Sequence, residues 1–444
     1  MINVDRFLRF INSRGKVINN LILKLNYFPY LLFGKNYRKK KKLLRLNFNN
    51  NKNVLDYTNY AISNTEFYSK YDKLYSIAEF KTNISFIDKD IVLESYNSFL
   101  NINIDFSNYV FGTTGGTSGK PMKLYIPKNR YDYELSVVHD IWERHGWNFD
   151  TRGVIRNHKL NSDEIYRIKP LTKEIIFDAF RLDEKYVKEL YEVLKKYNIK
   201  YIQAYPSSAY LFCKICKDLE LDISFIACFL TSSEPVLNFQ RHLIENVLGL
   251  NISSFYGHSE KLIIGGDCRE SKNIHFENSY GYVELVDENG NEISEVGQVG
   301  ELIATGFNNY GLMMIRFKTG DFAEFVSDKC DKCDKKGLIV KNIDGHRSKN
   351  MIYKADSTFT STTALNLHGE LYNKIDGLQY VQICKEKLTI KLIKNNLFTS
   401  EDHDGFKKHF ENAMGKTTRV EIEYVSNLEI LPNGKFPLLI SNLT

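Results

Sequence analysis

Residues 184–235 alternate between helical and short apolar segments, and this rhythm constrains the fold more than any other feature of the chain. The segments KYIQAYP and SFIACFLTS are apolar runs that each end in small or turn-forming residues, as buried strands do. Helical segments precede and separate them. Strands that alternate with helices in this way pair in parallel. The sequence therefore predicts an α/β fold with parallel-rich sheets.

The chain departs from this rhythm on both sides. Residues 1–100 are mainly helical in pattern. Alternating strands joined by Asn-Gly and Gly turns begin near residue 280 and predict a small antiparallel unit. The final segment is a strand-and-helix mixture of its own. The polar, glycine-containing stretch NIDGHRSKN at 342–350 predicts a domain boundary in front of that segment.

Composition leads us to expect a soluble, cytoplasmic protein of two or three domains. The 444 residues are 43% hydrophobic and 26% charged, as in ordinary globular chains. The first residues lack the pattern of a secretory signal, and the longest apolar runs are too short to span a bilayer. Seven cysteines in such a chain indicate thiols or metal ligands rather than a disulfide framework.

A basic run, KNYRKKKKLLR at residues 35–45, carries part of the net charge of +6. One interpretation is a solvated helix face. The other joins the run to the aromatic segment YFPYLLF at 27–33, so that residues 27–45 hold the protein at the inner face of an anionic membrane. No nucleic-acid-binding motif accompanies the charge, and we expect no nucleic-acid partner.

Residues 109–125, YVFGTTGGTSGKPMKLY, place a glycine- and hydroxyl-rich loop between two strand-like segments. Glycines let backbone N–H groups approach an anion closely, and hydroxyls and one lysine add donors. A Walker A motif is excluded because position 114 is Thr and position 121 is Pro, and the glycine spacing also excludes a dinucleotide fingerprint. The loop alone fits either a phosphate site or an ordinary glycine turn.

Five further motifs follow the loop in order: TSSEPV (231–236), SSFYGHSE (253–260), MIRFKTGD (314–321), DGHRSKNMI (344–352) and LPNGKF (431–436). Together they resemble the adenylate-forming superfamily of acyl-CoA synthetases and ligases. The likeness is greatest to the phenylacetate–CoA ligase family and its relatives in capsular-polysaccharide biosynthesis. It covers roughly residues 55–440.

This resemblance implies a large adenylation domain at 1–345, with parallel-rich sheets, helices and a small antiparallel unit. A hinge would follow at 346–350, and a small, mobile α+β domain at 351–444. The implied reaction joins a carboxylic acid to ATP with Mg²⁺, giving an acyl-adenylate and pyrophosphate. Coenzyme A or an amine, such as that of an amino sugar, would then take the acyl group. A catalytically inactive member that binds a nucleotide or partner is the alternative.

The resemblance also assigns site residues. Glu260 would hold Mg²⁺, Asp321 would accept both ribose hydroxyls, and Arg347 would contact ribose or phosphate. Lys435, on the mobile domain, would neutralise charge during adenylation. The β- and γ-phosphates would be wrapped by Thr114, Gly116, Thr117, Ser118, Gly119 and Lys120, and the nucleotide flanked by Ser233, Glu234, Pro235, Tyr256, Gly257 and Ser259. After the hinge, YKADSTF replaces the usual glycine-rich turn, which leaves the acceptor open.

Cysteine spacing suggests a metal site. Cys330 and Cys333 form a C-x-x-C knuckle, and GGDCRESKNIHFE supplies Cys268 and His275. Four such ligands would make a closed structural zinc site, a pattern that some relatives share. The alternative is a set of reduced thiols. Cys213 and Cys216 instead fit the apolar face of a helix.

Three histidines lie where the family builds part of its acyl pocket. They are His139, His145 and His158. We expect them to be buried structural residues.

Overall fold

The computed structural model describes residues 16–24, 29–44, 50–113, 122–156, 158–344, 351–355, 359–361, 365, 371, 374–415, 418–431 and 437–443. The chain forms two compact units. The first comprises residues 1–150, 170–173 and 253–343, and the second comprises residues 151–169, 174–252 and 344–444.

Helices dominate the N-terminal part of the first unit, as predicted. They are α2 (Lys16–Lys24), α3 (Pro29–Leu44), α4 (Asn50–Asn64), α5 (Ile77–Asn83), α6 (Lys89–Glu94) and α7 (Arg130–Arg144). Ser76 begins α5 by accepting a hydrogen bond from the backbone N–H of Glu79, and Asp88 caps α6 in the same way. No helix among the described residues is long and apolar enough to cross a bilayer.

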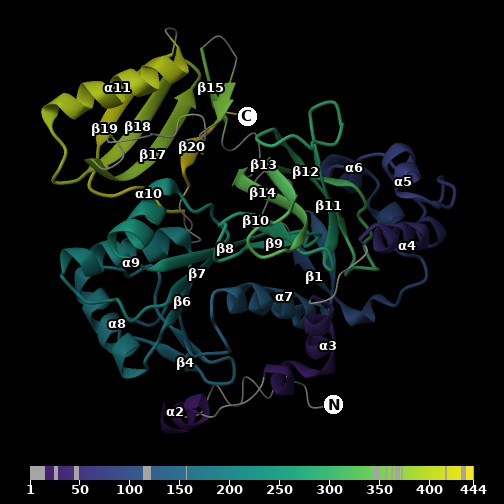
Figure 1. Ribbon diagram of the computed structural model, residues 1–444, viewed down its shortest axis with the longest axis horizontal. Coiled ribbons are helices and arrows are strands. Elements are labelled where there is room, and N and C mark those ends of the chain that lie inside the picture. The colour runs from purple at the N-terminus through teal and green to yellow at the C-terminus, as the bar shows by residue number, and fades with distance from the viewer. Residues whose placement is uncertain are drawn as a thin grey trace. The chain divides into compact units, whose positions relative to one another are not determined.

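A mainly antiparallel sheet completes the first unit and confirms the prediction for the region after residue 280. Its strand order is β11-β12-β13-β14-β10-β9-β8. The bounds are β8 (Asn251–Gly257), β9 (Ile264–Asp267), β10 (Ile274–Phe276), β11 (Gly281–Val286), β12 (Val299–Gly306), β13 (Phe317–Lys329) and β14 (Lys336–Asp344). Helix α4 lies beside β11 (Figure 1), and buried rings such as Phe80, Phe99 and Phe317 form the core between helices and sheet.

The glycine-rich loop is flanked by two strands, β1 (Tyr109–Thr113) and β2 (Lys123–Pro127), which pair antiparallel. The predicted strand–loop–strand arrangement is therefore present on both sides of the loop. Residues 114–121 themselves lie outside the described residues.

The second unit contains the predicted parallel strands. β3 (Arg152–Ile155), β6 (Tyr201–Ala204) and β7 (Cys228–Ser232) lie side by side in parallel, with β6 in the middle. β5 (Glu174–Ile176) extends the parallel arrangement beyond β3, and β4 (Arg167–Lys169) closes this edge antiparallel. The connecting helices are α8 (Glu184–Lys196), α9 (Pro206–Asp218) and α10 (Asn238–Arg241), followed by a π-helical turn at His242–Val247.

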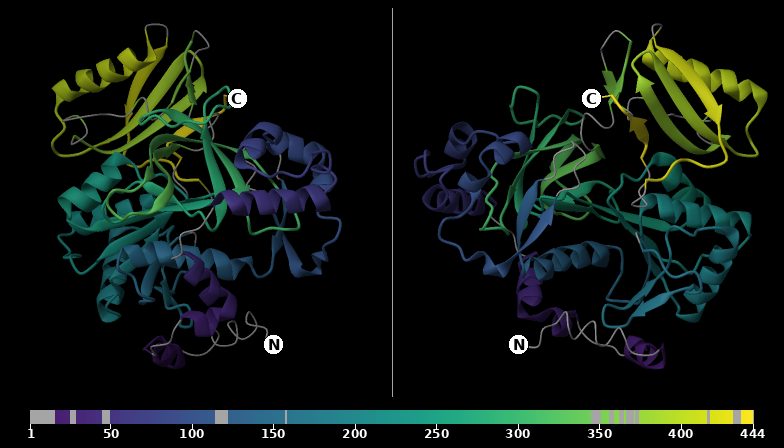
Figure 2. Two further views of the ribbon diagram at one scale, coloured as in Figure 1. Left: turned by 45° about the vertical axis from the view of Figure 1, so that its right-hand side comes forward. Right: turned by 180° about the vertical axis from the view of Figure 1, so that it is seen from behind.

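The C-terminal segment builds a sheet and a core of its own. Strands run in the order β19-β18-β17-β20, with bounds β17 (Ile375–Cys384), β18 (Lys387–Lys394), β19 (Arg419–Tyr424) and β20 (Leu439–Ser441). Helix α11 (Ser400–Met414) covers one face of this sheet (Figure 2), and its Phe406 and Phe410 are buried there. A short pair, β15 (Met351–Tyr353) and β16 (Phe359–Ser361), precedes it. The predicted hinge at 346–350 lies outside the described residues.

Candidate nucleotide site and metal cluster

Tyr256 and Asp321 form a direct contact in the first unit. Tyr256 lies near the end of β8 and Asp321 lies on β13, and the phenol donates to Asp321 Oδ2 across 2.6 Å. Burial raises the pKa of Tyr256 well above its ordinary value, and the Asp321 carboxylate raises it further. The phenol therefore remains protonated at neutral pH. It holds one carboxylate oxygen of Asp321 in a fixed position.

The turn after β8 brings Glu260 to the same place. His258 Nδ1 lies 2.9 Å from Glu260 Oε2, while the backbone N–H of Ile263 donates to His258 Nε2 at 3.3 Å. Because Nε2 accepts a hydrogen bond, the proton of a neutral imidazole sits on Nδ1 and is donated to Glu260. Glu260 also acts electrostatically on Tyr256. The structure thus gathers Tyr256, Asp321 and Glu260, whereas Gly257 and Ser259 are exposed around them.

Oxygen ligands dominate this grouping. Two carboxylates on neighbouring segments suit a hard cation and sugar hydroxyls. The supporting backbone is also fixed: Gly320 has φ +72° and its N–H donates to Glu301 Oε1 at 3.0 Å. The backbone N–H of the next residue, Asp321, donates to Thr319 Oγ1 at 3.1 Å. A residue with a Cβ would be strained at position 320.

Ser233 and Glu234 lie at the carboxyl end of β7, in the second unit. Ser233 has φ +72°, an uncommon conformation for a serine. Glu234 accepts hydrogen bonds from the backbone N–H and the hydroxyl of Ser207, both at 3.1 Å, at the start of α9. A carboxylate there is favoured by the partial positive charge of a helix N-terminus. Pro235 follows directly in the chain.

The remaining predicted nucleotide ligands lie outside the described residues. These are Thr114, Gly116, Thr117, Ser118, Gly119, Lys120, Arg347 and Lys435. Their assignments stay predictions.

The four predicted metal ligands converge in the first unit. Cys268, His275, Cys330 and Cys333 each offer one ligand atom, and these atoms all lie within 4.8 Å of one another. Cys268 follows β9 and His275 lies on β10, whereas the two remaining cysteines occupy the turn between β13 and β14. The cluster therefore joins two hairpins of one sheet. The three sulfurs and one imidazole fit the donor set of a structural zinc site.

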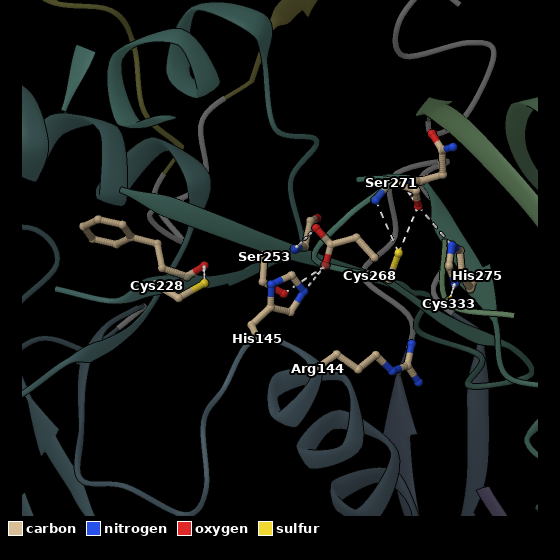
Figure 3. A network of polar contacts seen from close by, with 12 residues as sticks. Arg144, His145, Cys228, Ser253, Cys268, Ser271, His275 and Cys333 are labelled. Carbon is tan, nitrogen blue, oxygen red and sulfur yellow. Dashed lines mark hydrogen bonds and ion pairs between the residues drawn. The ribbon is translucent and has the colours of Figure 1, made fainter. Parts of the chain in front are cut away.

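The histidine of this cluster is oriented by a hydroxyl (Figure 3). His275 Nδ1 lies 3.5 Å from Cys333 Sγ, and its Nε2 lies 3.2 Å from Ser271 Oγ. Burial lowers the pKa of His275 to about 4, with Arg144 and Lys335 adding to the effect. The neutral imidazole that results is the form that ligates metals, and a hydrogen-bond partner on its second nitrogen is usual in such sites.

Burial also raises the pKa of the Cys330 thiol, but hydrogen bonds from the backbone N–H groups of Lys332 and Cys333 outweigh it. The net pKa is lowered. Such donors stabilise a thiolate, which is the form that binds a metal.

The buried Asp267 connects the cluster to β8. It directly precedes Cys268, and its Oδ1 lies 2.9 Å from His145 Nε2 and 3.0 Å from Ser253 Oγ (Figure 3). Its Oδ2 accepts from the backbone N–H of Ser254 at 2.9 Å. These contacts hold β8 against β9 two residues before Tyr256.

The other cysteines and histidines behave largely as expected. Cys213 and Cys216 are buried on α9, and burial raises the pKa of both thiols. His139 is buried and shares a 2.7 Å hydrogen bond with Tyr37. His158, in contrast, is half-buried.

The basic run occupies α3, and the two faces of this helix differ. Lys41 forms an ion pair with Glu143 of α7, and Lys40 lies 4.2 Å above the Tyr133 ring. The opposite face is exposed and carries Lys35, Arg38, Lys39 and Lys42 at helical spacing.

Two further residues belong to these groupings and were not predicted from the sequence. His258 lies inside the motif SSFYGHSE. Its hydrogen bond to Glu260 orients that carboxylate, and this contact could not be predicted from the order of residues in the chain. Arg156 follows β3, and its Nη2 donates to Ser233 Oγ at 3.0 Å. Its position as a cation directly after a buried strand was the one sequence feature that could have identified Arg156 as a candidate site residue.

Known proteins are similar to this chain in sequence or in fold. Residues 351–442 match the family described as the CapK C-terminal domain. The chain is 22% identical to protein CapK of Staphylococcus aureus over 98% of this chain and 96% of CapK. It is 33% identical to phenylacetate-coenzyme A ligase of Pseudomonas putida over 98 residues, which are 21% of this chain and 22% of that ligase.

Among solved structures, 2-hydroxyisobutyryl-CoA ligase in the postadenylation state, in complex with R3-HIB-AMP, superposes with a TM-score of 0.67. The identity is 14%, and 88% of each chain is covered. The fold is thus that of the adenylate-forming ligases, which confirms the predicted fold class. Within this fold, the chain is similar to CapK over nearly its whole length, and its residues 351–442 match the CapK C-terminal domain family.

Proposed function

We propose that this chain is an AMP-forming ligase that activates a carboxylic acid with ATP. In the first step, a carboxylate oxygen attacks the α-phosphorus and the bond to the β-phosphate oxygen breaks. The products are an acyl-adenylate and pyrophosphate. The observation that carries the proposal is the grouping of Tyr256 near the end of β8, Glu260 in the turn after it and Asp321 on β13, in an adenylate-forming fold.

The proposal gives each of these groups a role that its geometry supports. Asp321, with one oxygen held by Tyr256, accepts the hydrogen bonds of the ribose hydroxyls. Glu260, oriented by His258, is a hard oxygen ligand for Mg²⁺. When bound, Mg²⁺ neutralises charge on the pyrophosphate leaving group. Positioning and charge neutralisation are the main contributions such a site can make.

The remaining assigned residues complete the proposal. Of those outside the described ranges, residues 114 and 116–120 wrap the β- and γ-phosphates, and Arg347 contacts the ribose or a phosphate. Of the described residues, Ser233, Glu234 and Pro235, together with Gly257 and Ser259, flank the nucleotide. Lys435 enters for adenylation and leaves for acyl transfer, as residues 351–444 move about a hinge at 346–350.

In the second step, the acceptor nucleophile attacks the acyl carbonyl and AMP leaves. Coenzyme A is one acceptor. An amine of an amino sugar is the other. The segment YKADSTF at 353–359, which replaces the usual glycine-rich turn, leaves the choice between them open. Mixing preformed acyl-adenylate with each acceptor and measuring AMP release distinguishes them.

The metal cluster has a structural role in this proposal. Four protein ligands leave no open coordination position for a substrate, and zinc is the ion that three thiolates and an imidazole prefer. Zinc would lock the β9–β10 and β13–β14 hairpins together, and β9 supports β8 through Asp267.

We further propose a cytoplasmic protein that contacts the inner face of the membrane through α3. Its exposed face carries Lys35, Arg38, Lys39 and Lys42. Each such cation contributes about 1 kcal/mol near an anionic surface. Sedimentation with phosphatidylserine vesicles, compared with phosphatidylcholine vesicles at equal lipid concentration, tests this. Equal binding to both refutes it.

ATP–pyrophosphate exchange tests the central proposal. The exchange is measured with aryl, fatty, amino and sugar acids, in the wild type and in Glu260→Gln and Asp321→Asn variants. Activity with at least one acid, lost in both variants, is the expected result. Absence of exchange with every acid, together with tight ATP binding, favours the second candidate, a catalytically inactive member of the family.

A further inference from the structure

Three parallel strands of the second unit end in one group of polar and aromatic residues. Arg156 follows β3, Tyr205 follows β6, and Ser233 follows β7. The Arg156 guanidinium lies 4.8 Å from the centre of the Tyr205 ring and donates from Nη2 to Ser233 Oγ at 3.0 Å. Ligands of α/β proteins bind beyond the carboxyl ends of parallel strands, which is where this group lies.

Arg156 lacks an anionic partner within the described part of the chain. It is half-buried, and Ser233 and the Tyr205 ring, both uncharged, are its contacts there. Glu174 lies opposite Arg152, at the other end of β3, and is already shared by Arg152 and Lys169. A guanidinium offers five N–H donors in a planar fork that matches a carboxylate. Most of the N–H donors of Arg156 have no acceptor among its contacts in the described part of the chain.

His158 shows that positive charge accumulates around this position. The imidazole is half-buried, and burial lowers its pKa. Lys169, Arg167 and Arg156 lower the pKa further, against the single opposing charge of Glu174. Of these three cations, Arg167 is paired with Glu164 and Lys169 with Glu174, so Arg156 is the one without an ion pair among the described residues.

We infer that Arg156 recognises a second negatively charged group on the acyl substrate, so that the acid is a dicarboxylic acid or a sugar acid with a further anionic group. This inference rests on the proposed function. That function assigns the phosphates to the glycine-rich loop and Mg²⁺, and the ribose to Asp321. It leaves the acid without a recognition residue, and Arg156 supplies one.

Specificity follows from the cost of leaving this cation unpaired. An acid with a purely hydrocarbon body would remove water from the Arg156 guanidinium and offer no hydrogen-bond acceptor in return. A site that hydrogen-bonds its substrate discriminates strongly against an analogue that lacks the bonding group. Fatty and simple aryl acids should therefore be poor substrates.

The test compares matched pairs of acids: adipate with hexanoate, and 4-carboxyphenylacetate with phenylacetate. Exchange kinetics and calorimetric binding without nucleotide are measured for the wild type, Arg156→Gln and Arg156→Lys. Arg419→Gln is the control, because Arg419 is a 77% exposed arginine on β19. Circular dichroism and thermal unfolding establish that each variant is folded.

We expect the wild type to prefer the diacid of a pair by tenfold or more in kcat/KM. Arg156→Gln should raise KM for the diacid about tenfold and leave KM for ATP within twofold. Arg156→Lys should lie between, and Arg419→Gln should match the wild type. A preference for monoacids refutes the inference, and so does a rise in KM for ATP alone, which would assign Arg156 to the nucleotide.

Failure of the proposed function gives a different pattern. If no acid supports exchange but the diacids bind with an affinity that Arg156→Gln abolishes, the inference stands and the ligase proposal falls. If no acid of the panel binds or is exchanged, or if binding is the same in the wild type and Arg156→Gln, the inference is refuted.

Discussion

Metal removal should destabilise the unit that contains the antiparallel sheet. Cys268 and His275 come from the β9–β10 hairpin, and Cys330 and Cys333 come from the turn between β13 and β14. Without an ion, three thiols and an imidazole remain packed with their ligand atoms within 4.8 Å of one another and lose the bonds that join the two segments. The perturbation is the exchange of the purified protein into a strong chelator, or the double variant Cys330→Ser, Cys333→Ser.

The magnitude follows from mass action. An ion that binds only the folded state stabilises it by about 4 kcal/mol when its free concentration is about 1,000 times the dissociation constant. For a unit of roughly 150–250 residues, each kcal/mol shifts the melting temperature by about 2–4 °C. Removal should therefore lower the melting temperature by roughly 8–16 °C.

The assay pairs elemental analysis with thermal unfolding. We expect about one zinc per chain in the wild type and none in the double variant. Cys384→Ser is the matched control, because Cys384 is an exposed cysteine on β17 of the second unit and is not one of the four clustered residues. Metal-free protein with an unchanged melting temperature would refute the reasoning. Zinc retained by the double variant would assign the ion to other residues.

Three further results are expected. Glu260→Gln and Asp321→Asn should each reduce ATP–pyrophosphate exchange by roughly tenfold or more, and wild-type rates in both would contradict the nucleotide site. Arg316→Met should lower the free energy of unfolding in urea by about 3–5 kcal/mol, because Arg316 bonds both carboxylate oxygens of the buried Glu284 at 2.9 and 3.1 Å; a loss below 1 kcal/mol would be too small for this pair. Lys435→Ala should cost adenylation about 2.7–4 kcal/mol yet spare transfer from preformed acyl-adenylate, and equal loss of both steps in folded protein would contradict domain alternation.

Much of the fold could be predicted because its signals are local. The apolar runs that became β6 and β7 are short, continuous and bounded by turn residues. The Asn-Gly turn at 289–290 marks the strands of the antiparallel sheet, and Gly290 has φ +84°. The order in which β10 inserts between β9 and β14 could not be predicted, because pairing between distant strands depends on packing over the whole sheet.

Part of the candidate site could be proposed from the family resemblance of two motifs. Tyr256, Glu260 and Asp321 were assigned in this way, and the structure brings them together, while their roles stay predictions. The support from His258 was not predictable, because it depends on which imidazole nitrogen accepts from Ile263.

The basic run at residues 35–45 was also only partly predictable. Its composition predicted a helix face, but not that the cations would divide between a buried and an exposed side. That division is set by the pairing of Lys41 with Glu143, more than one hundred residues away in the chain.

The motif SSEP also fixes the local backbone through a contact with α9. Glu234 is engaged by Ser207 at the start of α9, so its carboxylate fixes the backbone that follows β7. This anchor helps to hold Ser233 at φ +72°, a conformation that costs about 1 kcal/mol or more and persists only when the surroundings impose it. The hydroxyl of Ser233 then accepts from Arg156. Because Ser233 is proposed to flank the nucleotide and Arg156 to read the acid, one strained residue would link recognition of both substrates, and a change in the α9 anchor should disturb the two together.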